Sequence, residues 1–242
     1  MATNGREQIL TWLSQLGEVA PAVQGISGTC PICRGIPGVG RIVCWHCERF
    51  HSSEALPDHL GFGVYALPGT QAGASMARYK SPGNTPQNDA FVASLAYLAL
   101  DEASSLGKHD VLCTLPSRSQ RHGRHPLSRL VEAANQKVTD PLYFDASLLR
   151  AAKGAEKQRG KVTPESFTVG AVRRKSVLVI DDTWKGGGSL ITAVAALRNA
   201  GAATVTAVAL ARWLSTDPNY DGTVVYAQAV KQYGAAGISF FT

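Results

Sequence analysis

The chain has 242 residues, of which 45% are apolar and 17% are charged, a composition that excludes a wholly disordered protein. Lysine and arginine number 24 against 18 aspartates and glutamates, which gives a formal net charge of +6. No run reaches the ~18 consecutive apolar residues of a membrane span, and residues 1–19 lack the pattern of a secretory signal. We therefore expect one or two folded domains in the cytoplasm, without membrane contact.

The first expected element is a short amphipathic helix over residues 5–19, in which Leu13 and Leu16 lie near one face. Four cysteines then follow in two Cys-x-x-Cys pairs, Cys30 with Cys33 and Cys44 with Cys47. We call residues 30–47 the cysteine segment, and we expect the helix to pack beside it. The two together form a predicted first domain over residues 1–55, and the second predicted domain covers residues 56–242.

Two Cys-x-x-Cys pairs at this spacing can place four thiolates tetrahedrally around one zinc ion. Such a site has no open coordination position, so its expected role is structural. Two disulfides and four ordinary buried thiols are the alternatives, and a chain without an export signal disfavours disulfides. The fifth cysteine, Cys113, lies alone in an apolar run and is expected to be a small core residue.

The remainder of the chain alternates predicted strands with predicted helices. Strands separated by helices predict an α/β fold with a parallel, doubly wound sheet, and such sheets bind ligands at the carboxyl ends of their strands. The predicted strands are 64–68, 111–116, 142–144, 176–182 and 204–211, and the predicted helices are 88–106, 126–136 and 189–200.

The clearest strand, 176–182, ends in Asp181 and Asp182, and a glycine-rich turn then leads into a helix. The turn reads Lys185, Gly186, Gly187, Gly188 and Ser189. Glycines let the backbone wrap around an anion, and the amides at a helix start point towards it. Ser189 is expected to cap the helix and to donate to a phosphate. A ribose 5-phosphate, with hydroxyls for the carboxylates and a phosphate for the turn, fits this pattern. The alternative is a plain turn with a solvated acidic pair.

Residues 177–212 resemble the phosphoribosyl diphosphate (PRPP) motif of type I phosphoribosyltransferases, and the four cysteines narrow the resemblance to the ComF-like family. This family includes competence protein F and amidophosphoribosyltransferase-like proteins. The resemblance implies a type I phosphoribosyltransferase-like parallel sheet preceded by a zinc ribbon, with Mg²⁺ bound together with PRPP. It implies that Asp181 and Asp182 hold the ribose hydroxyls and that residues 185–189 hold the 5-phosphate. Lys185 and Gly186 stand where the family pattern has two threonines, so one cation replaces two hydroxyl donors.

Two further basic stretches take their expected roles from the resemblance. Arg118, Arg121 and Arg124 lie where the family has its pyrophosphate loop, and the alternative for them is a solvated loop charge. Lys157 and Arg159 lie where the family has a flexible loop that closes over the substrate, which would give them a role in the transition state. The alternative for that stretch is a disordered basic linker.

Two functions from different classes follow. The first is a magnesium-dependent phosphoribosyltransferase that transfers the phosphoribosyl group to an amine or nucleobase and releases pyrophosphate. The second is a non-enzymatic, ComF-like DNA-processing factor that binds single-stranded DNA through Trp45, His46 and the basic residues of 118–175, which hold 13 of the 24 lysines and arginines. The resemblance also leaves open a homodimer or a partner in the competence machinery.

Overall fold

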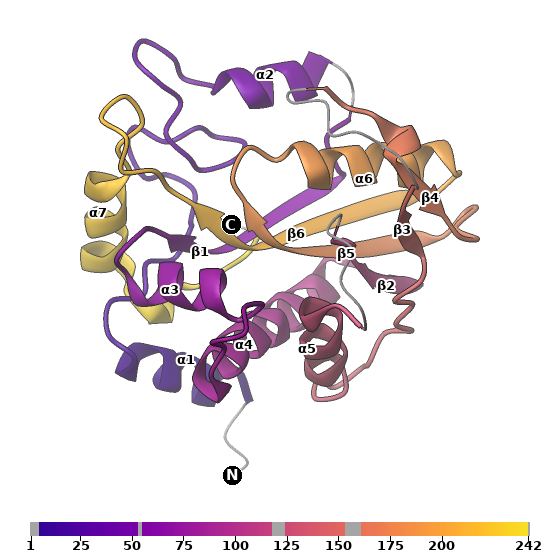
Figure 1. Ribbon diagram of the computed structural model, residues 1–242, viewed down its shortest axis with the longest axis horizontal. Helices are drawn as coiled ribbons and strands as arrows, with labels where there is room; N and C mark the ends of the chain where they lie inside the picture. The colour runs from indigo at the N-terminus through magenta and orange to yellow at the C-terminus, as the bar shows by residue number, and fades with distance from the viewer. Residues whose placement is uncertain (1–4, 53–54, 118–123, 153–160, 242) are drawn as a thin grey trace.

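The computed structural model describes residues 5–52, 55–117, 124–152 and 161–241. Its centre is a four-stranded parallel sheet in the order β1-β6-β5-β2 (Figure 1). The strands are β1 (His59–Ala66), β2 (Val111–Thr114), β5 (Ser176–Trp184) and β6 (Thr204–Trp213). The strands are almost continuously apolar and buried, as is typical of parallel strands that are covered on both faces. The predicted parallel α/β fold is therefore confirmed.

Helices cover both faces of this sheet (Figure 1). One face carries α6 (Gly188–Asn199), with α2 (Trp45–Ser52) of the cysteine segment beyond it. The other face carries α3 (Gln71–Arg78), α4 (Pro86–Ala103) and α5 (Pro126–Asn135). The remaining elements are α1 (Gly5–Gln15), α7 (Thr223–Tyr233), the antiparallel pair β3 (Leu149–Ala151) and β4 (Phe167–Val169), and the 3-10 turns η1 (Ser104–Leu106), η2 (Pro164–Ser166) and η3 (Ala235–Gly237).

Local sequence explains where the helices begin. Thr85 accepts a hydrogen bond from the Asn88 amide at the start of α4, and Pro86 stands in the first turn, where no amide donor is needed. Thr70 caps α3 in the same way. Among the described residues, no helix is long and apolar enough to cross a membrane.

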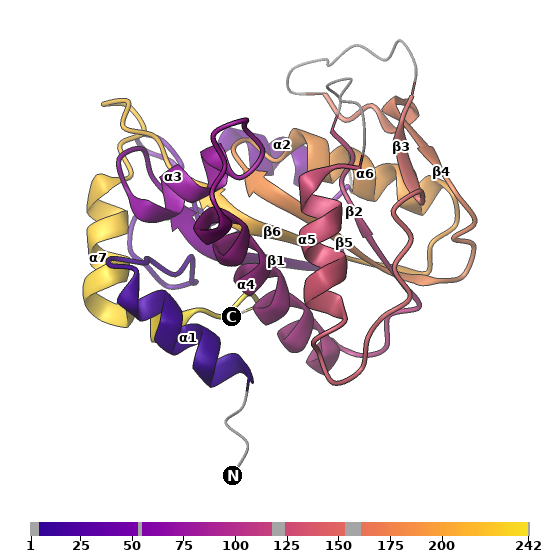
Figure 2. The same ribbon diagram turned by 60° about the horizontal axis from the view of Figure 1, so that its bottom comes forward.

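Several predicted elements differ from the observed ones. The first helix ends at Gln15 and packs against η3 and α4. Figure 2 shows it beside α4 and away from α2, so the expectation that it lies beside the cysteine segment is wrong. The reason is that Leu13 is buried in the apolar cluster that α4 dominates. The stretch 142–144 makes one isolated bridge, from Phe144 to Leu112, instead of a strand.

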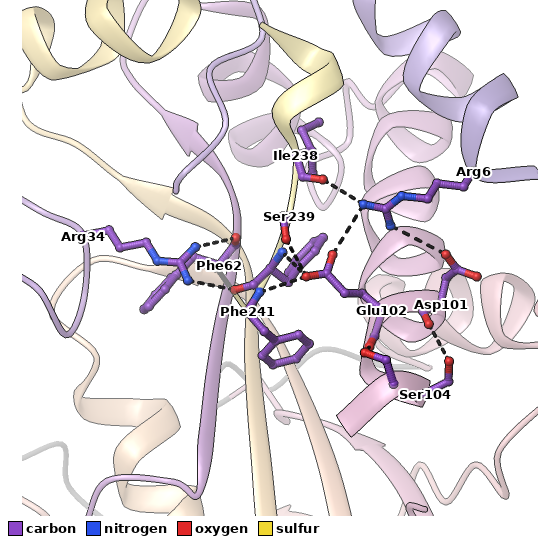
Figure 3. Close-up of polar contacts among 11 residues, drawn as sticks. Arg6, Arg34, Phe62, Asp101, Glu102, Ser104, Ile238, Ser239 and Phe241 are labelled. Atoms are coloured by element: carbon purple, nitrogen blue, oxygen red, sulfur yellow. Dashed lines mark hydrogen bonds and ion pairs between the residues drawn. The ribbon is translucent and has the colours of Figure 1, made fainter. Parts of the chain in front are cut away.

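The buried Arg34 and the half-buried Glu102 fasten the C-terminal segment to the core (Figure 3). The Glu102 carboxylate accepts hydrogen bonds from the Ser239 hydroxyl and from the Phe240 and Phe241 amides at 2.6, 2.9 and 3.1 Å. Arg34 of the cysteine segment donates to the carbonyls of Phe62 and Phe240 at 3.3 and 3.0 Å. The cysteines and β5 also share one apolar cluster. The cysteine segment is thus packed into the sheet domain, and a division at residue 55 stays a prediction.

Candidate functional site

The two adjacent carboxylates of β5 point to opposite faces of the sheet. Side chains alternate along a strand, so Asp181 shares a face with Val179, whereas Asp182 shares a face with Ile180. The strand does not end at Asp182 as predicted, because Thr183 and Trp184 still pair with β6. Trp184 is 2% exposed and packs edge-on against Phe50 and Phe62, which holds the backbone extended. The acidic pair therefore lies two residues before the end of the strand.

Asp181 and the glycine turn line one cavity of about 510 Å³. Its wall is formed by Asp181, Thr183 and residues 184–190 on one side, and by Trp45, His46 and Phe50 of α2 on the other. The Asp181 carboxylate accepts a hydrogen bond of 2.8 Å from the Asp182 amide. Burial, followed by the charges of Arg212 and Arg49, lowers the pKa of His46, so this ring is neutral at pH 7. Helix α2 thus covers the turn with aromatic, uncharged groups.

The conformation of the turn depends on Gly187. Its φ is +77°, and a Cβ atom there would lie 2.1 Å from the Trp184 ring. Helix α6 begins at Gly188 with Gly187 as its N-cap and without a side-chain cap. The predicted capping role of Ser189 is therefore wrong, because Ser189 already lies in the first turn of the helix. The first amides of α6 have no intrahelical acceptor, and they border the cavity.

Lys185 extends towards a neighbouring hollow. Its ammonium nitrogen lies 4.7 Å from the centroid of the Trp213 ring. This second hollow, of about 370 Å³, is lined among others by Trp45, His46, Arg212 and Tyr220. Lys185 borders both hollows, and its charge rests on an aromatic ring in this structure. The turn therefore presents mainly backbone groups to the cavity that it shares with Asp181.

Arg212, at the end of β6, ties the turn to the cysteine segment. Its guanidinium donates to the carbonyl of Cys33 at 2.7 Å and to the carbonyls of Trp184 and Lys185 at 3.2 Å each. It fits only because Gly35 has no side chain, since a Cβ atom at Gly35 would lie 1.7 Å from the guanidinium. The sequence carries no local signal for this contact, which joins residues 179 positions apart.

The four cysteine sulfurs form one buried cluster. All four lie within 4.8 Å of one another, and none is in a disulfide. The sulfurs of Cys33 and Cys44 are 3.7 Å apart. A tetrahedral ion with metal–sulfur bonds of about 2.3 Å requires sulfurs about 3.8 Å apart. Hydrogen bonds among the four thiols lower the pKa of Cys30 but raise the pKa of Cys44 and Cys47, so the fit to a metal rests on the sulfur geometry. Cys30, Cys33, Cys44 and Cys47 therefore fit a four-thiolate metal site.

The fifth cysteine has a different environment. Cys113 is fully buried in β2, and burial raises the pKa of its thiol. This agrees with the expectation of a core residue, since an uncharged thiol is a poor nucleophile and a poor ligand.

Asp182 lies in a polar contact that sequence reasoning missed. The Tyr79 hydroxyl donates to its Oδ2 atom, and the Lys80 Nζ atom lies 2.5 Å from the same oxygen. Asp182 is 7% exposed, and Tyr79 is 1% exposed. Both partners directly follow α3 and are more than 100 positions away in the sequence, so no spacing pattern could have indicated them.

The predicted basic residues are only partly described. Arg124 is exposed, pairs with Glu132 at 2.5 Å and lies over the Phe144 ring, so it does not reach the acidic pair. Arg118, Arg121, Lys157 and Arg159 lie outside the described residues, and their roles stay predictions.

Comparison with known proteins agrees with this sheet and turn. Residues 87–232 match the phosphoribosyl transferase domain family, and the chain belongs to that family. The matched region holds β2, β5, the glycine turn and β6, whereas the four clustered cysteines, Tyr79 and Lys80 precede it. A search of curated proteins finds no match.

Solved structures include distant neighbours. The hypoxanthine phosphoribosyltransferase from Staphylococcus aureus is 12% identical over 55% of this chain and 67% of its own, with a TM-score of 0.35. A phosphoribosyltransferase from Corynebacterium diphtheriae is 21% identical over 60% of this chain and 75% of its own, with a TM-score of 0.32. The allosteric regulatory enzyme of purine biosynthesis is 18% identical over 49% of this chain, with a TM-score of 0.34. This chain spans only 26% of that enzyme.

Proposed function

We propose that this chain binds PRPP with Mg²⁺ at the carboxyl end of β5 and transfers the phosphoribosyl group to an amine or nucleobase nitrogen. One observation carries the proposal: in a phosphoribosyl transferase domain, Asp181 and the glycine turn line the same cavity. A carboxylate accepts hydrogen bonds from hydroxyls, and the first amides of a helix bind phosphate. A sugar that carries a terminal phosphate needs both groups at once.

The chemistry assigned to the residues is mainly positioning and charge stabilisation. The amides of residues 186–189 hold the 5-phosphate, and Asp181 holds a ring hydroxyl. The bond from C1 to the pyrophosphate oxygen breaks, and its electron pair leaves with pyrophosphate. The acceptor nitrogen forms the new bond to C1 and then loses its proton to solvent. Asp181 and Asp182 bring negative charge close to the ring carbon while it is electron-poor.

Two ions belong to this proposal. Mg²⁺ takes oxygen ligands, which carboxylates and the diphosphate and hydroxyls of PRPP supply, and it would neutralise pyrophosphate as it leaves. Zn²⁺ is our proposal for the cysteine cluster, because four thiolates and the sulfur spacing suit it. Four protein ligands leave no position for a substrate, so its role is to hold the cysteine segment against the turn through Arg212.

A thermal-shift titration tests the proposal. At a PRPP concentration of 100 times Kd, binding stabilises by about 2.7 kcal/mol, which corresponds to a rise in Tm of roughly 5–10 °C. The double variant Asp181→Asn with Asp182→Asn is expected to lose the shift, whereas Asp140→Asn, in an exposed loop, is expected to keep it. No shift with Mg²⁺ and millimolar PRPP would contradict the proposal. Pyrophosphate release with ammonia or nucleobases as acceptors then tests turnover.

A second candidate function is binding of single-stranded DNA, and one observation favours it. Trp45 is 39% exposed, and the Arg49 guanidinium lies 5.3 Å from its ring centroid, an arrangement that suits base stacking. The expected binding weakens with salt, with a slope of roughly −0.7 per phosphate contact, and Trp45→Ala weakens it at every salt concentration. Absent or salt-independent binding would argue against this function. The two functions do not exclude each other.

A further inference from the structure

The ammonium group of Lys80 lies on the carboxylate that faces away from the phosphate turn. The Nζ–Oδ2 distance to Asp182 is 2.5 Å, with 35% of the Lys80 side chain and 10% of the Asp182 side chain exposed to solvent. The Tyr79 hydroxyl donates to the same oxygen and is itself buried. Asp182 is thus fixed by Tyr79, while the partly exposed Lys80 is able to reach a ligand.

This contact lies beside the start of the loop that follows β2. The Leu115 amide donates to the Ile180 carbonyl at 2.9 Å, so the chain leaves β2 beside the part of β5 that directly precedes the acidic pair. Among the described cations, Lys80 is paired with Asp182, whereas Arg124 is paired with Glu132. Lys80 therefore supplies a positive charge at this edge of the sheet, whereas Arg124 does not.

We propose that Lys80 is a binding residue for the pyrophosphate group of PRPP, an inference that rests on the proposed function. In PRPP the 2-hydroxyl and the oxygen that carries pyrophosphate are on neighbouring carbon atoms. We assign the second ring hydroxyl of the sugar to Asp182, so a cation in contact with this carboxylate is within reach of the pyrophosphate oxygens. An ammonium group has three N–H donors on a flexible stem, so it can bind a phosphate oxygen while it stays near Asp182.

The proposal also explains why the enclosed Asp182 carboxylate is paired with a lysine. Lys80 neutralises Asp182 when no PRPP is bound. When PRPP is bound, Lys80 donates to pyrophosphate, which keeps the electron pair of the broken C1–O bond. Lys80 stabilises that negative charge, and Tyr79 continues to orient Asp182.

A comparison of two ligands tests this role. Ribose 5-phosphate has the hydroxyls and the 5-phosphate of PRPP but lacks pyrophosphate. In calorimetric titrations with Mg²⁺, Lys80→Met is expected to weaken PRPP binding about tenfold or more and to change ribose 5-phosphate binding less than about twofold. Lys80→Arg keeps the charge and is expected to retain most of the preference for PRPP. Lys231→Met, which removes an exposed charge on α7, is expected to change neither affinity.

The outcomes separate this inference from the proposed function. If Lys80→Met weakens both ligands by the same factor, or weakens neither, Lys80 serves only as the counter-ion of Asp182 and the inference is overturned. If the native chain binds neither ligand, the proposed function itself fails. Should Lys80→Met fold poorly, Lys80→Arg and Lys80→Gln decide the question. A charge-dependent role predicts that the ratio of the affinity for PRPP to the affinity for ribose 5-phosphate falls only in Lys80→Gln.

Discussion

The two faces of β5 surround its adjacent carboxylates in different ways. On the Asp181 face, the carboxylate lies in a cavity with a glycine turn whose shape is held by Trp184, Arg212 and the cysteine segment. On the Asp182 face, the carboxylate is enclosed by the Tyr79 hydroxyl and the Lys80 ammonium. In our proposal, the first face recognises an anion with backbone amides, and the second adds a side-chain cation. Neighbouring residues of one motif have different surroundings, because a strand turns them to opposite sides.

Loss of the cysteine cluster is expected to have the largest effect on the Asp181 face. Cys33→Ser removes one of four buried ligands, so metal content falls and the free energy of unfolding decreases by roughly 3 kcal/mol or more. Elemental analysis and urea unfolding measure both quantities. Cys113→Ala, another buried cysteine, is the control and should keep the metal. Full metal content in Cys33→Ser would contradict the four-thiolate assignment.

Substitution of Arg212 tests most clearly whether the two faces of β5 have different roles in ligand binding. Arg212→Met leaves the Trp184 and Lys185 carbonyls without their donor, which should cost about 2–3 kcal/mol of stability. In the proposed function the turn holds the 5-phosphate, so PRPP and ribose 5-phosphate should lose affinity by the same factor, unlike in Lys80→Met. Calorimetric titration of both ligands measures this. If Arg212→Met weakened PRPP and ribose 5-phosphate binding by different factors, the proposed division of roles between the two faces of β5 would be wrong.

The glycine turn itself offers a matched pair of variants. Gly187→Ala places a Cβ atom against Trp184 at a positive φ and should destabilise the protein by at least about 1–2 kcal/mol. Gly188→Ala has no atom within 4 Å of its added Cβ and lies in a helix, so its unfolding free energy should stay equal or rise. Urea unfolding compares the two. Equal stabilities would show that Trp184 does not determine the turn.

The smallest effect is expected far from both carboxylates, at His109. This ring is 7% exposed and lies 3.0 Å from the Thr206 hydroxyl, and burial, followed by His59, lowers its pKa below the ordinary 6.5. Below pH 6.5 the unfolded chain binds a proton that the folded chain does not, so stability falls as the pH is lowered. His109→Gln should flatten this dependence in unfolding curves between pH 5 and pH 8. An unchanged pH profile would show that His109 titrates normally.

The sequence predicted those parts of the site that depend on short segments. An apolar strand, two carboxylates, three glycines and a helix pattern are contiguous, so β5, the turn and α6 could be read from residues 176–200. The four cysteines could also be identified as a candidate metal site, because the spacing of such ligands is a local sequence pattern. Arg212 and the Tyr79–Lys80 pair were not, because their contacts join residues 179 and about 100 positions apart. The C-terminal end of β5 was predicted two residues too early, because Trp184 packs against Phe50 and Phe62, which no local pattern contains.

Diffraction from crystals soaked with Mg²⁺ and PRPP tests the central claim most directly. We predict density for the 5-phosphate within hydrogen-bond distance of the amides of residues 186–189, with a ring hydroxyl on Asp181. Density for PRPP at another place, or a turn without phosphate at a concentration that saturates binding in solution, would contradict the account.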